Sequence, residues 1–212
     1  MNKTGMLILL LLASCCVDKS NFKIQKALVQ TRQIQAKTTE KEVDTLKLDL
    51  DRSKLYWKGT KMRGAGSHEG EVIISQGFLL RDNAGLSGGK FEINMKSISI
   101  TDIPKTDPIP IKNLTEHLMH ADFFDVDNFP NSGFVITKIT THFPENPEIS
   151  GNLTIRGITK NVTLSAIHHD NTLSSRFLID RFDWNIAYEG SWADRTLVDR
   201  EIEFRVKLVL RE

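Results

Sequence analysis

The stretch that decides the fold lies near the end of the chain and reads Glu201-Ile202-Glu203-Phe204-Arg205-Val206-Lys207-Leu208-Val209-Leu210-Arg211. Apolar residues occupy every second position from Ile202 to Leu210, and charged residues fill most of the positions between them. Successive side chains of a β-strand point to opposite faces. The stretch therefore predicts a half-buried antiparallel strand with one apolar face.

The same alternation recurs upstream, beginning at Leu46 and again around Phe91. Turn residues such as Asp82-Asn83-Ala84-Gly85 and His169-Asp170-Asn171 separate the alternating runs. The pattern predicts an all-β domain of about eight strands, since strands of this kind can close into an antiparallel barrel that holds side chains or one small ligand. The expected strands are 46–62, 68–80, 86–98, 132–142, 148–156, 160–169, 172–186 and 199–211.

One segment departs from the period of two. Ile111, Leu114 and Leu118 recur at helical spacing, after the proline-rich stretch 104–110 and before Asp122. This spacing predicts a short crossover helix with an apolar stripe. We expect the helix to act as a lid over one mouth of the barrel.

The N-terminal residues indicate export. Lys3 precedes an apolar run that ends at Leu12, which is the pattern of a secretory signal peptide and is too short to span a bilayer. The sequence Leu12-Ala13-Ser14-Cys15 resembles the lipobox of bacterial lipoproteins, in which acyl chains on the cysteine anchor the protein to a membrane. Plain secretion with a small-residue cleavage site is the alternative.

The chain is thus divided into three parts. Residues 1–14 are expected to be the lipoprotein signal peptide, 15–44 the lipidated Cys15 with a flexible tether, and 45–212 the barrel domain. A helical form of the tether stays open, because Phe22, Lys26 and Val29 could share one face of a helix, with Ile24 and Leu28 nearby. The expected location is the bacterial cell envelope, as a periplasmic or surface lipoprotein anchored to the outer membrane.

Composition excludes several classes of function. Lys plus Arg is 28 and Asp plus Glu is 27, so no positive excess is available to follow a nucleic-acid backbone. The two cysteines are the adjacent Cys15 and Cys16, which leaves the folded domain without a disulfide, a zinc–cysteine site or a cysteine nucleophile. A homodimer is left open.

Three motifs resemble chemical sites, but none predicts a catalytic residue, a metal or a cofactor. The Gly85–Gly89 segment matches the G-x-S-x-G pattern of a hydrolase, but a strand is expected after Ser87 where that motif needs a helix. The acidic residues around Asp125 do not have EF-hand spacing and are interpreted as a helix stop and loop. His117 and His120 are interpreted as residues of the last helical turn rather than zinc ligands.

From about Leu46 to Arg211 the chain resembles proteins of the YceI-like domain family. The most specific match is His117-Leu118 followed by Asp122-Phe123-Phe124-Asp125 and Phe129-Pro130. Further matches are Gly151-Asn152-Leu153-Thr154-Ile155 with Gly157-Ile158-Thr159-Lys160, and Ile179-Asp180-Arg181 with Trp184. The chain departs from the family pattern at Asn185 and Ala187, where Gly is expected, and at Asn161, where Pro is common.

This resemblance implies a lipocalin-like barrel whose apolar lumen accepts a polyisoprenoid, an isoprenoid quinone or another lipid. On this hypothesis the strands line a tunnel, while the helix and the phenylalanines after it gate it. The expected ligand-binding residues are Trp57, Phe91, Ile93, Leu114, Leu118, Phe123, Phe124, Phe134, Ile136, Leu153, Ile155, Phe177, Ile179, Trp184, Phe204 and Val206. The competing hypothesis is a ligand-free interaction protein of the envelope with a packed barrel, and a hydrolase is a third.

Overall fold

A computed structural model describes residues 24–32, 42–141, 145–187 and 198–211. The predicted signal peptide and Cys15 lie outside the described residues, as does most of the predicted tether. None of the helices in the described part of the chain is long and apolar enough to span a bilayer.

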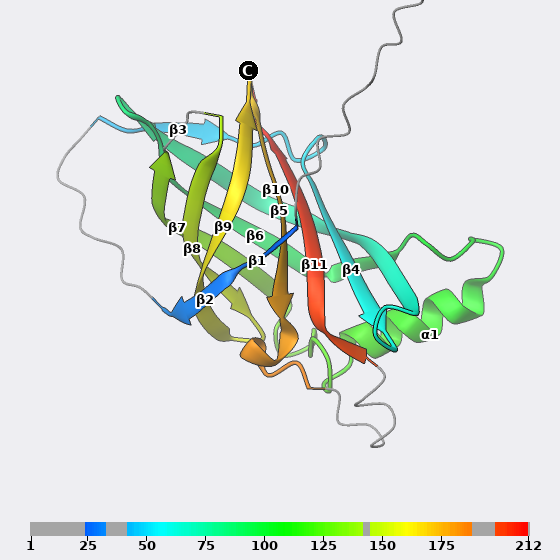
Figure 1. The fold of residues 1–212 in the computed structure, drawn as a ribbon. Coiled ribbons are helices and arrows are strands. Elements are labelled where there is room, and N and C mark those ends of the chain that lie inside the picture. Colours follow the sequence, from blue (N-terminus) through cyan, green and yellow to red (C-terminus); the bar gives the residue numbers. More distant parts are fainter. Residues whose placement is uncertain (1–23, 33–41, 142–144, 188–197, 212) are drawn as a thin grey trace, which may run out of the picture.

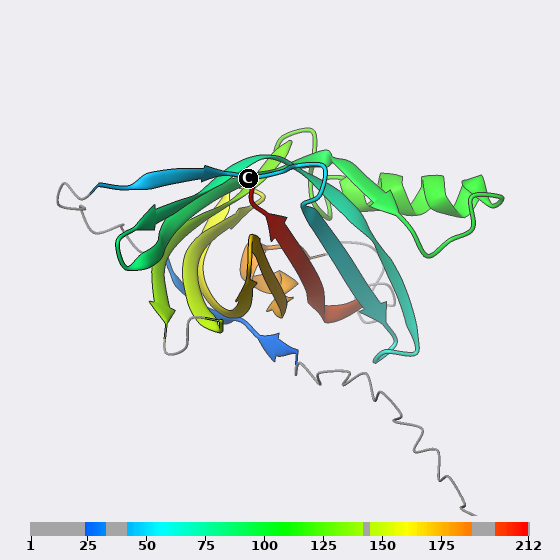
Figure 2. The same cartoon turned by 90° about the horizontal axis from the view of Figure 1, so that it is seen from above.

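Eight strands form a closed antiparallel barrel, which confirms the predicted fold class (Figures 1 and 2). Each strand pairs with the next one along the chain, and the last pairs with the first. The alternating apolar residues thereby face a common interior. The barrel strands are β4 (Lys54–Lys61), β5 (Gly66–Asp82), β6 (Gly85–Ile100), β7 (Asn131–Thr141), β8 (Pro147–Ile155), β9 (Ile158–His169), β10 (Thr172–Asp180) and β11 (Val198–Val209).

Two of the predicted strands differ in extent from the observed ones. The predicted strand 46–62 is divided into β3 (Asp44–Lys47) and β4, which both pair with β5. A turn separates them, in which the Ser53 N–H donates to the Asp49 carbonyl at 2.9 Å. The predicted strand 172–186 ends at Asp180, whose carboxylate accepts a hydrogen bond from the Phe182 N–H and starts the 3-10 helix η1 (Arg181–Trp184).

Residues 24–32, expected as part of a flexible coil, are placed in the barrel wall instead. Here β1 (Gln25–Lys26) pairs in parallel with β10, and β2 (Leu28–Thr31) pairs antiparallel with β9. Figure 1 shows this segment crossing the wall where β9 and β10 separate. Ala27 is only 6% exposed, and Val29 packs against the core. Small apolar side chains at alternate positions allow the segment to complete the sheet.

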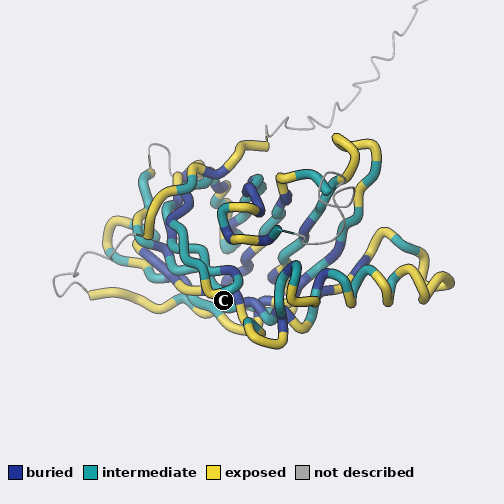
Figure 3. Tube along the Cα trace, turned by 90° about the horizontal axis from the view of Figure 1, so that it is seen from below, coloured by how far each residue is buried: buried dark blue, intermediate teal, exposed yellow. Residues whose placement is uncertain are grey.

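The helix α1 (Pro108–Met119) confirms the predicted crossover helix, but most of it projects to one side of the barrel (Figure 2). Its apolar stripe of Ile111, Leu114 and Leu118 packs against the core, and the helix contacts β6. The other faces are exposed, with Ile109 at 71% (Figure 3). The helix therefore covers a side of the barrel end rather than its mouth.

η1 closes the barrel end near α1. The fully buried Trp184 donates its indole N–H to the Leu153 carbonyl at 3.2 Å. Arg181, 1% exposed, donates to backbone carbonyls of Ile186, Val198 and Asp199, and burial lowers its pKa from the ordinary value. Asn185 follows in the left-handed conformation with φ 53°, which Asn tolerates in place of the Gly expected from the family pattern.

Candidate functional site

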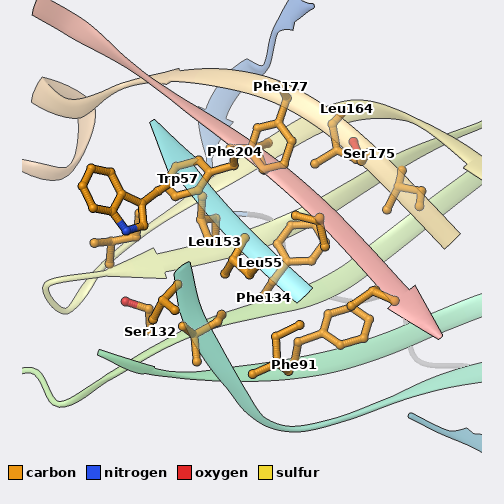
Figure 4. A pocket seen from close by; sticks show the side chains of 18 of the residues that line it. Leu55, Trp57, Phe91, Ser132, Phe134, Leu153, Leu164, Ser175, Phe177 and Phe204 are labelled. Carbon is orange, nitrogen blue, oxygen red and sulfur yellow. The ribbon is translucent and has the colours of Figure 1, made fainter. Parts of the chain in front are cut away.

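The interior of the barrel holds an apolar cavity (Figure 4). The space between its lining side chains has a volume of about 1110 Å³, including the part that is open to solvent. The part of this space that a water-sized molecule can occupy is about 140 Å³, close to the size of an apolar cavity of about 150 Å³ that can hold a benzene-sized molecule. The barrel is therefore not plugged by its own side chains.

Eleven of the residues predicted to bind ligand line this cavity, because they lie at inward-facing positions of the strands or, for Phe124, in the loop after α1. Figure 4 shows several of their side chains directed into the common space. The eleven are Trp57, Phe91, Ile93, Phe124, Phe134, Ile136, Leu153, Ile155, Phe177, Phe204 and Val206.

The other five predicted residues do not line the cavity. Ile179, at the end of β10, and Trp184, in η1, are fully buried in the packed end of the barrel. Leu114 and Leu118 attach α1 to the core, and Phe123 is buried against Phe124 with ring centroids 4.9 Å apart. The residue that reaches the cavity from this region is Phe124, so the loop after the helix, rather than the helix, contributes to the cavity wall.

Sequence reasoning missed further lining residues that continue the same alternation. Leu55 lies two positions before Trp57, Met95 two after Ile93, and Leu208 two after Val206, so a stricter use of the period would have found them. Three serines had no such signal, because Ser132 and Ser175 are polar side chains at inward positions, and Ser174 lies at an outward position between the inward Leu173 and Ser175. The missed lining residues are Leu55, Val72, Ile74, Met95, Ile98, Ser132, Ile149, Val162, Leu164, Ala166, Leu173, Ser174, Ser175 and Leu208.

Aromatic rings form much of the cavity surface. Phe91 and Phe134 are stacked with ring centroids 6.4 Å apart, and Phe177 and Phe204 lie tilted at 5.7 Å. None of the described residues that line the cavity is charged. Charged groups of the neighbouring strands lie on the outer face instead, as where Arg176 donates to Glu203 at 2.8 Å. The described lining therefore offers dispersion contacts to an apolar ligand, and it offers no counter-charge to a charged one.

The sequence motifs that resemble a hydrolase site and a metal site have structural roles instead. Ser87 lies exposed in β6 just after the β5–β6 turn, where Gly85 has φ +118°, so a strand follows Ser87 as expected from the sequence. Asp125 lies in a loop and accepts a hydrogen bond from the Asn128 side-chain amide at 2.9 Å. In the described ranges, no group of three His, Cys, Asp or Glu side chains could hold a metal ion.

A closed antiparallel barrel with an apolar cavity defines a class of small-molecule binding folds. The YceI-like domain model matches residues 46–210, so the chain belongs to the YceI-like domain family.

Individual relatives agree with the family. The chain is 37% identical over 51 residues to a UPF0312 protein of Pseudomonas putida, which covers 24% of this chain and 27% of the relative. It is 43% identical over 51 residues to a UPF0312 protein of Enterobacter sp., covering 24% and 26%. The matched part thus spans about a quarter of the length of these curated relatives.

Two solved structures are similar to this chain. The crystal structure of Burkholderia cenocepacia BcnA has a TM-score of 0.62 and 22% identity, covering 76% of this chain and 98% of that one. The crystal structure of the Campylobacter jejuni YceI protein has a TM-score of 0.49 and 16% identity, covering 85% and 91%. The likeness to BcnA supports the barrel fold.

Proposed function

We propose that this protein binds a long apolar ligand in the bacterial cell envelope, for storage or transport. The ligand class is a polyisoprenoid, an isoprenoid quinone or another lipid-like molecule. The observation that carries this proposal is the cavity between the barrel strands, where the lining residues that the structure describes are apolar except for three serines. The competing hypothesis of a ligand-free interaction protein required an interior filled by large side chains.

The energy available from such binding is large. An eight-unit isoprenoid would bury on the order of 1,000 Å² of apolar surface, which corresponds to roughly 25 kcal/mol before the costs of ordering the ligand and the protein. A ligand held in this way would stay bound during gentle purification.

The envelope location rests on the first fifteen residues. The predicted signal peptide and the lipobox at Cys15 would place the barrel at a membrane surface, where isoprenoids and quinones are dissolved. The membrane contact would then be made by the acyl chains on Cys15. A non-catalytic role is proposed with it, since the binding-barrel fold and the strand position of Ser87 both favour binding over hydrolysis.

The test combines ligand identification with a filled-cavity variant. Mass spectrometry of gently purified, denatured protein should release a stoichiometric lipid-like molecule. Val206→Trp adds an indole to the cavity face of β11, whereas Lys207→Trp adds it to the exposed outer face of the same strand. We expect Val206→Trp to lose most of the ligand and Lys207→Trp to retain it. Protein that is repeatedly empty, or equal retention by the two variants, would contradict the proposal.

A further inference from the structure

The cavity is smaller than the ligand class that its lining suits. The part that a water-sized molecule can occupy is about 140 Å³, close to an apolar cavity that holds one benzene-sized molecule. A polyisoprenoid or another long lipid has many times the volume of benzene. A long ligand therefore requires part of the barrel to move when it enters.

In the described barrel, the wall between β9 and β10 has the fewest direct strand pairs. These strands pair at four positions, whereas every other pair of neighbouring barrel strands pairs at six positions or more. Beyond Ser175 a strap of residues 25–31 lies between them (Figure 1). The strap pairs with β9 at four positions but with β10 at only two, so its contact with β10 is the weakest line in the wall.

Few apolar contacts hold the strap in place. Its largest apolar side chain, Leu28, is 65% exposed, whereas the buried position is occupied by the small Ala27 and Val29 is only partly buried. Regions that bury little apolar surface open at a low cost in free energy. We therefore expect the strap to separate from β10 more readily than the long-paired strands separate from one another.

An opening between the strap and β10 leads into the cavity. Phe177 on β10 and Val162 on β9 line the cavity on either side of the strap. Ala27 lies between these strands, donates its N–H to the β10 backbone and belongs to the same apolar core cluster. The exposed Leu28 offers an arriving apolar chain a first contact on the outer side.

We propose that the ligand enters and leaves the cavity sideways, between the strap and β10, when the strap separates from β10. This inference rests on the proposed function and adds the route to its binding site. It makes residues 25–31 a gate, and these residues precede the range 46–210 that the family model matches.

The test locks the strap to β10 with a disulfide. Lys26 and Leu178 are direct partners in the β1–β10 ladder, and neighbouring strands lie about 4.8 Å apart, within the range that a disulfide spans. The natural Cys15 and Cys16 are replaced by serine in every full-length protein of the set. The cysteines of the double variant Lys26→Cys with Leu178→Cys are then its only thiols.

The control is a disulfide elsewhere in the wall. Thr140 and Glu148 are partners in the β7–β8 ladder, and neither β7 nor β8 pairs with the strap. The double variant Thr140→Cys with Glu148→Cys therefore adds a cross-link away from the proposed route. Thiol titration and mass spectrometry show when each disulfide has formed.

The readout is the rate at which each protein takes up radiolabelled squalene, a hydrocarbon built of isoprene units, from phosphatidylcholine vesicles. The oxidised strap variant should take up squalene about tenfold more slowly than its reduced form, and reduction should restore the rate. The control should take it up equally fast in both forms. Lys26→Met removes only the ion pair with Glu201 and should speed uptake about twofold.

The outcomes separate the gate from the carrier. If the oxidised strap variant is as fast as its reduced form, if the control slows as much, or if Lys26→Met leaves the rate unchanged, the gate is overturned and the apolar carrier stands. A strap variant that cannot be oxidised would contradict the pairing on which the gate depends. If the parent protein without added cysteines takes up no squalene, the proposed function itself fails.

Discussion

Seven of the eight strand junctions of the barrel are long, whereas the junction between β9 and β10 is short. The long junctions pair between six and eleven positions, as between β6 and β7 and between β5 and β6. β9 and β10 pair at only four positions, from Thr172 to Ser175, beside the turn that joins them. Beyond Ser175 the two strands separate, and each takes a partner from residues 25–31.

The difference shows that the barrel wall depends on a segment outside the family domain. The family match begins at residue 46, yet the N–H of Ala27 donates to the Leu178 carbonyl at 2.8 Å. The seam is the place beyond Ser175 where β9 and β10 separate and residues 25–31 lie between them. Val162 on β9 and Phe177 on β10 line the cavity on either side of the seam, and they pair with Val29 and Gln25. One part of the cavity wall is therefore closed by the chain that leads toward the predicted anchor.

The largest effect is expected in the long-paired wall. A Cβ at Gly70 would lie 1.8 Å from the Ser99 carbonyl oxygen, and this backbone atom cannot move aside cheaply. Gly70→Ala should lower the free energy of unfolding by about 3 kcal/mol or more. Gly59 lies on the adjacent strand β4 with nothing within 4 Å of a Cβ, so Gly59→Ala should be neutral or stabilise by about 0.5 kcal/mol. Urea denaturation measures both, and similar midpoints for the two variants would refute the prediction.

The next effect is expected at the seam. Removal of residues 1–41 takes away β1 and β2, whereas removal of residues 1–23 leaves them in place. The longer deletion loses about six pairing positions and the burial of Ala27, offset by the entropy of ordering the segment. We expect the longer deletion to unfold about 2 kcal/mol more easily than the shorter one. Equal urea midpoints would mean that the segment does not support the wall.

The strand pattern was the part of this protein that sequence predicted best. Alternation fixes which residues face inward, so Phe91, Phe134 and Phe204 were placed in the lumen without any knowledge of pairing. The same rule could not show that Ile179 and Trp184 lie in the packed end of the barrel. The strand period of two assigns each side chain to a face of the sheet. Whether the space beside an inward side chain is open or filled depends on how η1 folds over the interior of the barrel.

Two features depended on contacts that no local pattern records. The residues 25–31 have no strong alternation of charge, and their strand form follows from the unpaired edges of β9 and β10. The buried Nε1 of Trp57 is a similar case: it has no hydrogen-bond partner among the residues that the structure describes, and a tryptophan at an inward position has the same sequence signature whether or not its N–H is paired. Both required the three-dimensional arrangement.

The smallest effect on the free energy of unfolding is expected from an ion pair on the outer face of the seam. Lys26 Nζ lies 2.9 Å from Glu201 Oε1, with half of each side chain exposed, and the hydrogen bond to Glu201 raises the pKa of Lys26 above its ordinary 10.5. An exposed pair of this kind contributes about 0.3 to 0.5 kcal/mol. Because the folded pKa is raised, this contribution is fully present below pH 10.5 and is lost as the pH rises through the folded value.

Lys26→Met should therefore lower stability by the same small amount at pH 7 and pH 9, and should match the wild type well above pH 10.5. Its local effect is sharper, because opening of the seam should make the Ala27 amide exchange with solvent about twofold faster at pH 7. Lys112→Met is the control, since it breaks a still more exposed pair with Glu116 on α1, far from the seam in sequence. If Lys112→Met accelerates Ala27 exchange as much as Lys26→Met does, the ion pair has no specific role in closing the barrel.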